Sequence, residues 1–239
     1  MSERTAYRRE SRATTDRPVL AGVDLARTFG RGTTQVQALD GVGLEVPAGR
    51  LTVVRGPSGS GKTTLLNLLG GLDRPTSGQV LLDDGRVLSE LPEKEVLAVR
   101  RERIGYVFQS FGLVPVLSAA ENVEVPLRLR KVQVGERTAR VEEALELVGL
   151  ARHAKQRPYE LSGGQQQRVG IARALVGSPD ILIADEPTGQ LDSETAATIM
   201  DLLVDLTYGQ GIASVVATHD PVLMGRADQV VELHDGRRV

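Results

Sequence analysis

Apolar and polar positions divide the chain into short runs typical of strands and longer runs typical of helices. Residues 51–55 are apolar and β-branched and lead into Gly56, the pattern of a buried strand. Residues 63–72 then place leucines at helical spacing. Because strands and helices continue to alternate, we predict an α/β fold with a mainly parallel sheet covered by helices. Further strands are predicted at 19–29, 42–46, 79–82, 104–108, 181–184, 213–218 and 229–233, and further helices at 92–103, 136–148, 165–176 and 193–206.

The alternation is interrupted after residue 108, where helical patterns dominate for about fifty residues. The clearest of them places Val141, Ala144, Leu145 and Val148 on one stripe. We read this stretch as a helical insertion within the α/β core. The first residues are polar and Arg-rich, and we expect them to form a disordered tail. The predicted organisation is a tail at 1–17 and a single domain at 18–239, with its core at 18–108 and 164–239 and a helical subdomain at about 109–163.

The composition narrows the classes of function. Of the 239 residues, 41% are hydrophobic and 25% charged, as in an ordinary globular protein. The formal net charge of −2 gives no indication of a nucleic-acid partner. The chain has no cysteine, which excludes disulfides and thiolate metal sites. The longest uncharged stretch, residues 104–120, is shorter than the roughly 20 apolar residues of a membrane span. We therefore expect any membrane role to come through a partner.

A glycine-rich loop between the predicted strand 51–55 and the helix after it matches the phosphate-loop pattern G-x-x-x-x-G-K-[ST]. The glycines let several N–H groups face one point, at which the following helix directs its positive end. Lys62 adds a charge for the β- and γ-phosphates, and Thr63 is placed to ligate Mg²⁺. A chance glycine- and serine-rich loop would not explain these flanking elements. The predicted nucleotide-binding residues here are Gly56, Ser58, Gly59, Ser60, Gly61, Lys62, Thr63 and Thr64.

Two carboxylates end the apolar run at 181–184. Asp185 would hold the Mg²⁺ shell, and Glu186 would orient or deprotonate the attacking water. Strands often end in acidic residues, so this pair gains its meaning from the phosphate loop. Together the two elements predict a nucleoside-triphosphate hydrolase.

Residues 161–165, Leu-Ser-Gly-Gly-Gln, distinguish the chain from other phosphate-loop proteins. A serine and two glycines at a helix start form a second anion-binding end. One nucleotide does not need two helix termini from one chain. We therefore infer that Ser162, Gly163, Gly164 and Gln165 meet a nucleotide held by another subunit. A capped surface helix would explain Ser162 but not the Gly-Gly-Gln that follows.

Residues 161–165 resemble the signature motif of the ATP-binding cassette (ABC) ATPases. The other motifs follow in that family's order from about residue 19 onward. The resemblance implies a phosphate-loop NTPase fold: a RecA-like core with a mainly parallel sheet, an N-terminal antiparallel β region and an inserted helical subdomain. It also implies ATP and Mg²⁺ as cofactors, and a dimer of two copies that closes on ATP.

The resemblance assigns roles to further residues. Gln109 resembles the glutamine that touches the metal or its water, and His219 the histidine that contacts the γ-phosphate. Phe29 resembles the aromatic residue that stacks on adenine, where the family more often has tyrosine. His153 and His234 match no motif, and we assign both to the surface. The implied catalytic residues are Glu186, His219 and Gln109, and the implied metal ligands are Thr63, Gln109 and Asp185.

Residues 67–78 and 107–115 resemble the macrolide-export and lipoprotein-release branch of the family. That branch implies an integral membrane permease with a large extracytoplasmic domain, driven in export or in force transmission across the membrane. It also implies a cytoplasmic location on the inner face of the plasma membrane. The apolar segment 111–117 fits either a groove for a permease helix or a buried part of the helical subdomain.

Other classes of protein also bind a nucleoside triphosphate on a phosphate loop and are alternatives to a transporter ATPase. An ATPase of a cell-division or cell-wall-regulating complex resembles the same branch. Soluble ABC ATPases of the ribosomal type resemble two cassettes in one chain, and those of the chromosome-handling type need a long coiled coil, whose heptads do not occur here. A small-molecule kinase would leave residues 161–165 unexplained. We therefore predict the ATPase subunit of an ABC transporter, with no nucleic-acid partner.

Overall fold

Two β-sheets and the helices around them make up the structure, a computed structural model that describes residues 18–30 and 32–239. The larger sheet has the strand order β5–β6–β7–β3–β8–β9, and the smaller has the order β2–β1–β4. The tail predicted at residues 1–17 lies outside the described residues. The strands are β1 (Leu20–Phe29), β2 (Val36–Val46), β3 (Leu51–Arg55), β4 (Ser77–Leu82), β5 (Ile104–Val107), β6 (Ile181–Asp185), β7 (Ala213–Ala217), β8 (Gln229–His234) and β9 (Arg237–Arg238). The helices are α1 (Lys62–Leu69), α2 (Glu93–Arg103), α3 (Ala119–Leu129), α4 (Val134–Leu147), α5 (Gly163–Leu175), α6 (Ser193–Gln210) and α7 (Pro221–Arg226).

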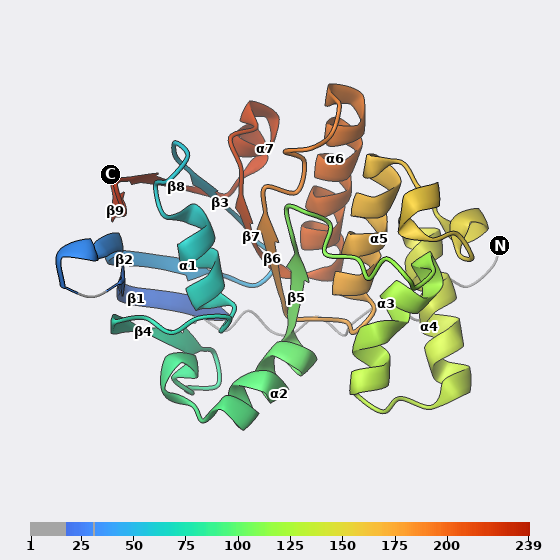
Figure 1. Ribbon diagram of the computed structural model, residues 1–239, viewed down its shortest axis with the longest axis horizontal. Helices are drawn as coiled ribbons and strands as arrows, with labels where there is room; N and C mark the ends of the chain where they lie inside the picture. Colours follow the sequence, from blue (N-terminus) through green and yellow to red (C-terminus); the bar gives the residue numbers. More distant parts are fainter. Residues whose placement is uncertain (1–17, 31) are drawn as a thin grey trace.

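The larger sheet lies at the centre of the molecule (Figure 1). β5, β6, β7, β3 and β8 pair in parallel, and β9 pairs antiparallel with β8. Every residue of β6 and β7 is buried, as expected of strands covered on both faces. β1, β2 and β4 form the antiparallel sheet. The predicted fold, a mainly parallel α/β core with an N-terminal antiparallel region, is confirmed.

The two faces of the large sheet bury separate cores. Ile181 and Ile183 of β6 belong to a core that includes α1, α2 and the small sheet. Leu182 and Ala184 belong to a core that includes α3, α4, α5 and α6. This division follows from the alternation of side chains along a strand. α1 and α5 therefore lie on opposite faces of the sheet.

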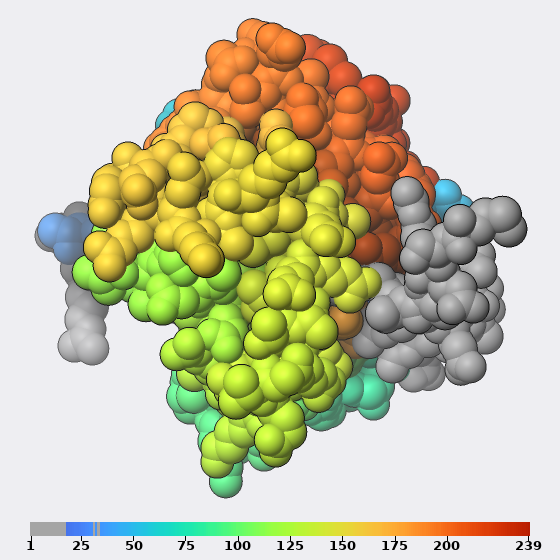
Figure 2. All heavy atoms as spheres, turned by 90° about the vertical axis from the view of Figure 1, so that its right-hand side faces the viewer, coloured from blue at the N-terminus to red at the C-terminus, as the bar shows by residue number. Residues whose placement is uncertain are grey.

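A group of helices packs beside β5, where α3 and α4 contact each other and α5. α3 begins with a capping box, in which Ser118 and Glu121 each accept a hydrogen bond from the other's amide. The predicted apolar stripe of α4, with Val141 and Leu145, is buried. Figure 2 looks onto this end of the molecule, where residues from α3 to the start of α5 form most of the visible face.

Some elements differ from the expectations. α1 ends at Leu69 rather than at residue 72, because Gly70 and Gly71 follow and Gly71 takes a left-handed φ of 62°. α7 and β9 were not predicted, because both are shorter than the windows in which a hydrophobic period can be recognised. Asp220 nevertheless caps α7 by accepting hydrogen bonds from two amides of its first turn. None of the helices in the described part of the chain is long and apolar enough to cross a membrane.

Candidate active site

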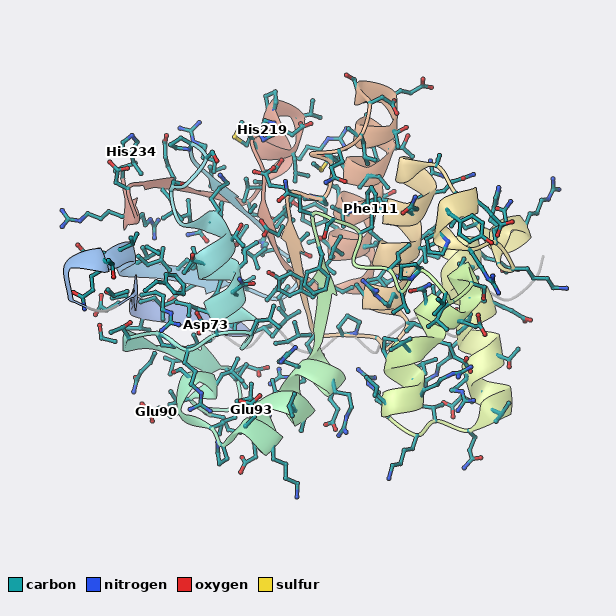
Figure 3. The ribbon with its side chains drawn as sticks, viewed as in Figure 1. Asp73, Glu90, Glu93, Phe111, His219 and His234 are labelled. Atoms are coloured by element: carbon teal, nitrogen blue, oxygen red, sulfur yellow. The ribbon has the colours of Figure 1, made fainter. Side chains whose placement is uncertain are left out.

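The predicted site residues follow four neighbouring parallel strands. The phosphate loop at residues 56–63 follows β3, and Asp185 and Glu186 come at the end of β6. Gln109 follows β5 and His219 follows β7. Because the carboxyl ends of parallel strands meet at one edge of a sheet, the topology gathers these residues from distant parts of the sequence. Figure 3 shows His219 at this edge, near α7.

Close backbone contacts shape the phosphate loop. A Cβ at Gly56 would lie 2.2 Å from the carbonyl oxygen of Leu233, and one at Gly61 would lie 2.5 Å from that of Ala38. Gly61 also has a φ of 99°, which other residues rarely adopt. The loop therefore needs glycine at both positions. Gly61 provides α1 with no side-chain cap, so first-turn N–H groups of the helix stay free to bind an anion.

Lys62 turns back over this loop. Its Nζ donates hydrogen bonds to the carbonyl oxygens of Gly56 (2.8 Å) and Pro57 (3.1 Å). The same nitrogen lies 3.8 Å from Oε1 of Glu186, and both side chains are largely buried. The positive charge is thus held between the loop and the carboxylate of Glu186, which follows β6.

Asp185 places a carboxylate inside the protein. Burial raises its pKa, while a hydrogen bond with Thr63 and the charge of Lys62 act in the opposite direction. Its Oδ1 has no hydrogen-bond partner among the described residues. A buried carboxylate oxygen without a partner, beside a hydroxyl, has the chemistry of a Mg²⁺ ligand set. The described residues contain no group of three or more His, Cys, Asp or Glu that could hold a metal ion.

Glu186 has an unusual backbone. Its φ is 43°, in the left-handed region that non-glycine residues seldom occupy. Its amide donates a hydrogen bond to the carbonyl oxygen of Ala217 on β7 (2.9 Å). Oε2 lies 3.2 Å from Nδ1 of His219, although the two atoms are not aligned as a hydrogen bond. Such strain is typical of functional sites, and here it directs a shielded carboxylate toward Lys62 and an 80% exposed histidine.

The loop after Gln109 is anchored to α5. Phe111 and Gly112 both have left-handed φ values, 60° and 62°. The guanidinium of Arg173 on α5 donates hydrogen bonds to both of their carbonyl oxygens. Gln109 is exposed, and a Cβ added at Gly189 would lie 3.8 Å from its Nε2. The loop therefore joins α5 to the segment that follows Glu186. Figure 3 shows Phe111 on this loop.

Residues 162–165 have a structural explanation that the sequence analysis did not foresee. Ser162 and Gln165 form a capping box, with hydrogen bonds of 3.3 and 2.9 Å between side chains and amides. A Cβ at Gly164 would lie 2.3 Å from Cγ2 of Thr195 on α6. The expectation that a capped helix explains only Ser162 is therefore wrong, because Gln165 completes the cap and Gly164 makes room for α6. The first two amides of α5, those of Gly163 and Gly164, still lack partners within the helix.

Other residues lie outside this central group. Phe29 is at the end of β1 and 42% exposed, and its side chain contacts that of Arg27. His153 is not a plain surface residue as expected, since its Nε2 lies 3.2 Å from Nε2 of Gln165. Tyr106 was not predicted as part of the site, but its hydroxyl donates a hydrogen bond to Oδ1 of Asn67 on α1 (3.0 Å). Burial, and secondarily the charge of Asp185, raise the pKa of Tyr106. A lone tyrosine in a predicted strand gave no signal of this contact.

A glycine loop that leads into a helix, with a lysine above it and a buried acidic strand end beside it, defines a phosphate-loop nucleoside triphosphatase. Comparison with known families identifies the kind. The ABC transporter family model matches residues 39–189, and the chain belongs to this family as one of its ATP-hydrolysing cassettes.

The chain is similar to ATP-binding proteins of about its own length and to longer export proteins. An uncharacterized ABC transporter ATP-binding protein of Thermotoga maritima is 46% identical over 219 residues, which are 92% of this chain and 93% of the relative. The macrolide export ATP-binding/permease protein MacB of Hyphomonas neptunium is 42% identical over 92% of this chain. The pyoverdine export ATP-binding/permease protein PvdT of Pseudomonas aeruginosa is 44% identical over 95% of it. This chain spans only 34% of the length of each of these two export proteins.

Solved structures agree with the fold. The ABC transporter ATP-binding protein MJ0796 of Methanocaldococcus jannaschii is 44% identical to this chain, and the cassette MJ0796 has been solved in dimeric form. One of those structures is a post-hydrolysis state bound to ADP and Pi. It superimposes with a TM-score of 0.85 at 41% identity and covers 92% of this chain and 97% of that chain.

Proposed function

We propose that two copies of this chain bind two ATP molecules between them and that ATP hydrolysis in this dimer drives a membrane permease. The observation that carries the proposal is the placement of α1 and α5 on opposite faces of the large sheet. A nucleotide on the phosphate loop is thus separated from residues 162–165 of the same chain, and a second copy has to supply that segment. The dimeric structures of MJ0796 support the same arrangement.

The phosphates of ATP occupy the loop at residues 56–63 in this proposal. The first-turn amides of α1 and Nζ of Lys62 bind them, and Lys62 gives up its carbonyl contacts to do so. Thr63, Asp185 and Gln109 hold Mg²⁺, which when bound neutralises charge on the phosphates. The unpartnered Oδ1 of Asp185 supports this assignment. The remaining loop contacts come from Gly56, Ser58, Gly59, Ser60, Gly61 and Thr64.

Glu186 acts on the attacking water in the proposed reaction. Its largely buried carboxylate lies 3.2 Å from Nδ1 of His219. The carboxylate can therefore accept a proton from the attacking water or orient that water. His219 is 80% exposed, and in this proposal its ring contacts the γ-phosphate. Across the dimer, the amides of Gly163 and Gly164, with Ser162 and Gln165, contact the γ-phosphate held by the other chain. Phe29 stacks on the adenine ring.

The chain works on the inner face of the plasma membrane in this proposal, with a permease that has a large extracytoplasmic domain. Two export proteins that join an ATP-binding part to a permease in one chain support a membrane partner. The loop after Gln109 offers exposed apolar side chains for the contact, since Val114 is 41% and Val116 73% exposed. A helical subdomain at about residues 109–163 transmits the closing of the dimer to that contact. The partner is a protein rather than a nucleic acid.

Glu186→Gln tests the proposal. The amide keeps the shape of the side chain but loses the proton acceptor, so ATP hydrolysis should fall by roughly 100-fold or more while ATP still binds. The variant should then accumulate as an ATP-bound dimer, measured by sedimentation with and without ATP. The tagged dimer should retain an integral protein with a large external domain from detergent-solubilised membranes of its own cell.

Glu102→Gln is the matched control, because Glu102 lies exposed near the end of α2 and pairs with its neighbour Arg101. It should hydrolyse ATP at the wild-type rate and remain monomeric. A Glu186→Gln chain that hydrolyses ATP normally would overturn the role of Glu186. If ATP produces the dimer but only soluble proteins are retained, the cassette chemistry stands and the membrane partner does not.

A further inference from the structure

A cation covers one face of the exposed Phe29 ring. Cζ of Arg27 lies 4.5 Å from the centroid of that ring, within the range of a cation–π contact. Both side chains come from the end of β1. We propose that Arg27 is a positioning residue of the nucleobase site, which fixes the ring of Phe29 so that its other face receives the purine. This inference rests on the proposed role of Phe29 in stacking on adenine.

Arg27 is itself held in place. Its Nε donates to Oδ2 of Asp73 (2.8 Å) and its Nη2 donates to Oδ1 (2.9 Å). The two side chains are only 25% and 31% exposed. A two-point contact of this kind fixes the plane of the guanidinium as well as its position, which one ammonium group would not do. The plane that lies against Phe29 is therefore set by Asp73.

Asp73 connects this contact to the helix of the phosphate loop. Asp73 lies just beyond the C-terminal end of α1, and its amide donates a hydrogen bond to the carbonyl oxygen of Asn67 in that helix (3.2 Å). The neighbouring segment is also fixed to β1, because the amide of Thr76 donates to Ala26 and its hydroxyl accepts from the amide of Thr28. Figure 3 shows Asp73 at the lower end of α1, beside the small sheet.

These contacts fix the position of Phe29 relative to the phosphate loop, so the two parts of one nucleotide site are held together. α1 begins at Lys62, where the phosphates bind, and ends beside Asp73, which holds Arg27 and through it Phe29. A ring held before the ligand arrives does not lose side-chain freedom on binding. The purine then completes a stack of guanidinium, phenyl ring and base. Adenine affinity should therefore depend on Arg27 although Arg27 does not touch the nucleotide.

The test is a set of binding measurements on the full nucleotide-free chain. Arg27→Met keeps the aliphatic stem but removes the planar cation. It should weaken ATP binding by roughly three- to tenfold in titration calorimetry. Inorganic tripolyphosphate, which has no base, should bind to the variant and to the wild type equally. Asp73→Asn leaves Arg27 in the chain but loosens it, and should reproduce part of the loss for ATP alone.

Two further variants separate the possible results. In a Phe29→Ala background, Arg27→Met should cause no additional loss, because the pair acts through one ring. Arg86→Met is the matched control. Arg86 is also held by an aspartate, Asp84, but no aromatic ring of the described residues contacts it as Phe29 contacts Arg27, so ATP affinity should stay unchanged.

Three results would overturn the inference. An Arg27→Met chain with wild-type ATP affinity, when Phe29→Ala binds ATP weakly, would remove Arg27 from the base site and leave the stacking role of Phe29 intact. An equal loss for ATP and tripolyphosphate would indicate general damage to the site. A loss that persists in the Phe29→Ala background would indicate direct contact with the nucleotide. If Phe29→Ala itself binds ATP normally, the proposed stacking role fails first.

Discussion

Asp185 brings a carboxylate into the interior, where water cannot solvate it well. Its neighbours, Thr63 and Lys62, oppose the effect of burial on its pKa but do not cancel it. Glu186 next to it has a left-handed backbone. Both features lower the stability of the folded chain, and the proposed reaction accounts for both. At the scale of single residues, the site is therefore where the fold departs from what stability alone would select.

Removing the charge of Asp185 should make the chain more stable and inactive. Because the folded pKa is raised, the stability due to this group is fully present below the unfolded pKa and is lost as pH rises through the folded pKa. Asp185→Asn should therefore melt higher than the wild type at pH 7, by roughly 2–4 °C for each kcal/mol recovered, without nucleotide or Mg²⁺. The difference should shrink on acidification, and ATP hydrolysis should be lost.

Thermal unfolding between pH 5 and 8 measures this effect. Asp205→Asn on the exposed side of α6 is the control and should not change the melting temperature. An Asp185→Asn chain that melts below the wild type at pH 7 would show that the carboxylate stabilises the fold instead.

At the scale of elements, the ends of helices and strands differ in how their polar groups are satisfied. α5 begins with a capping box that leaves the amides of Gly163 and Gly164 without partners in the helix, and α1 begins without a side-chain cap. Asp228, just before β8, serves the fold alone. Its carboxylate accepts hydrogen bonds from the amide of Leu51, from Arg50 and from the hydroxyl of Tyr208. It therefore joins the start of β3 to α6 and to the entry of β8.

Asp228→Asn should lower stability in a pH-dependent way. Burial raises the pKa of Asp228, but the bonds from Leu51, Arg50 and Tyr208 outweigh burial and lower it overall. Such a group contributes stability above its unfolded pKa, and that contribution is lost as pH falls through the folded pKa. The variant should lose about 1–2 kcal/mol of unfolding free energy at pH 7.

Urea unfolding at pH 7 and near pH 3.5 tests this prediction. The gap between variant and wild type should narrow on acidification, below about pH 4, where an ordinary aspartate takes up its proton. A gap of equal size at both pH values would show that the charge of Asp228 does not contribute.

At the scale of the whole molecule, the large sheet separates α1 from α5. α1 packs on one face of the sheet and α5 on the other. In the proposed dimer, each nucleotide is bound by the start of α1 of one chain and the start of α5 of the other. A symmetric pair of chains would use both helix starts of each chain.

Ser162→Asp tests the half-site of α5 without disturbing its cap, because aspartate caps a helix as well as serine does. The added charge should repel the γ-phosphate held by the second chain. In the Glu186→Gln background, the ATP-dependent dimer should weaken by roughly 100-fold or more, measured by sedimentation equilibrium, while ATP affinity of the single chain stays unchanged.

Ser162→Asn carries the control, since asparagine also caps but is neutral. It should weaken the dimer far less than the aspartate variant does. Equal dimerisation of Ser162→Asp and Ser162→Asn would remove residues 162–165 from the proposed interface.

The sequence by itself determined most of the elements, the phosphate loop and the acidic strand end, because strand periodicity and glycine spacing are local properties. Lys62, Asp185 and Glu186 were predicted as site residues in this way. The spacing of Ser162 and Gln165 is likewise the local pattern of a capping box, which the structure contains. Tertiary structure alone decided which faces the helices cover and that Arg27 lies between Phe29 and Asp73. The packing of the helices and the contact of Arg27 with Asp73 join residues far apart in the chain, and such pairs leave no pattern in the order of amino acids.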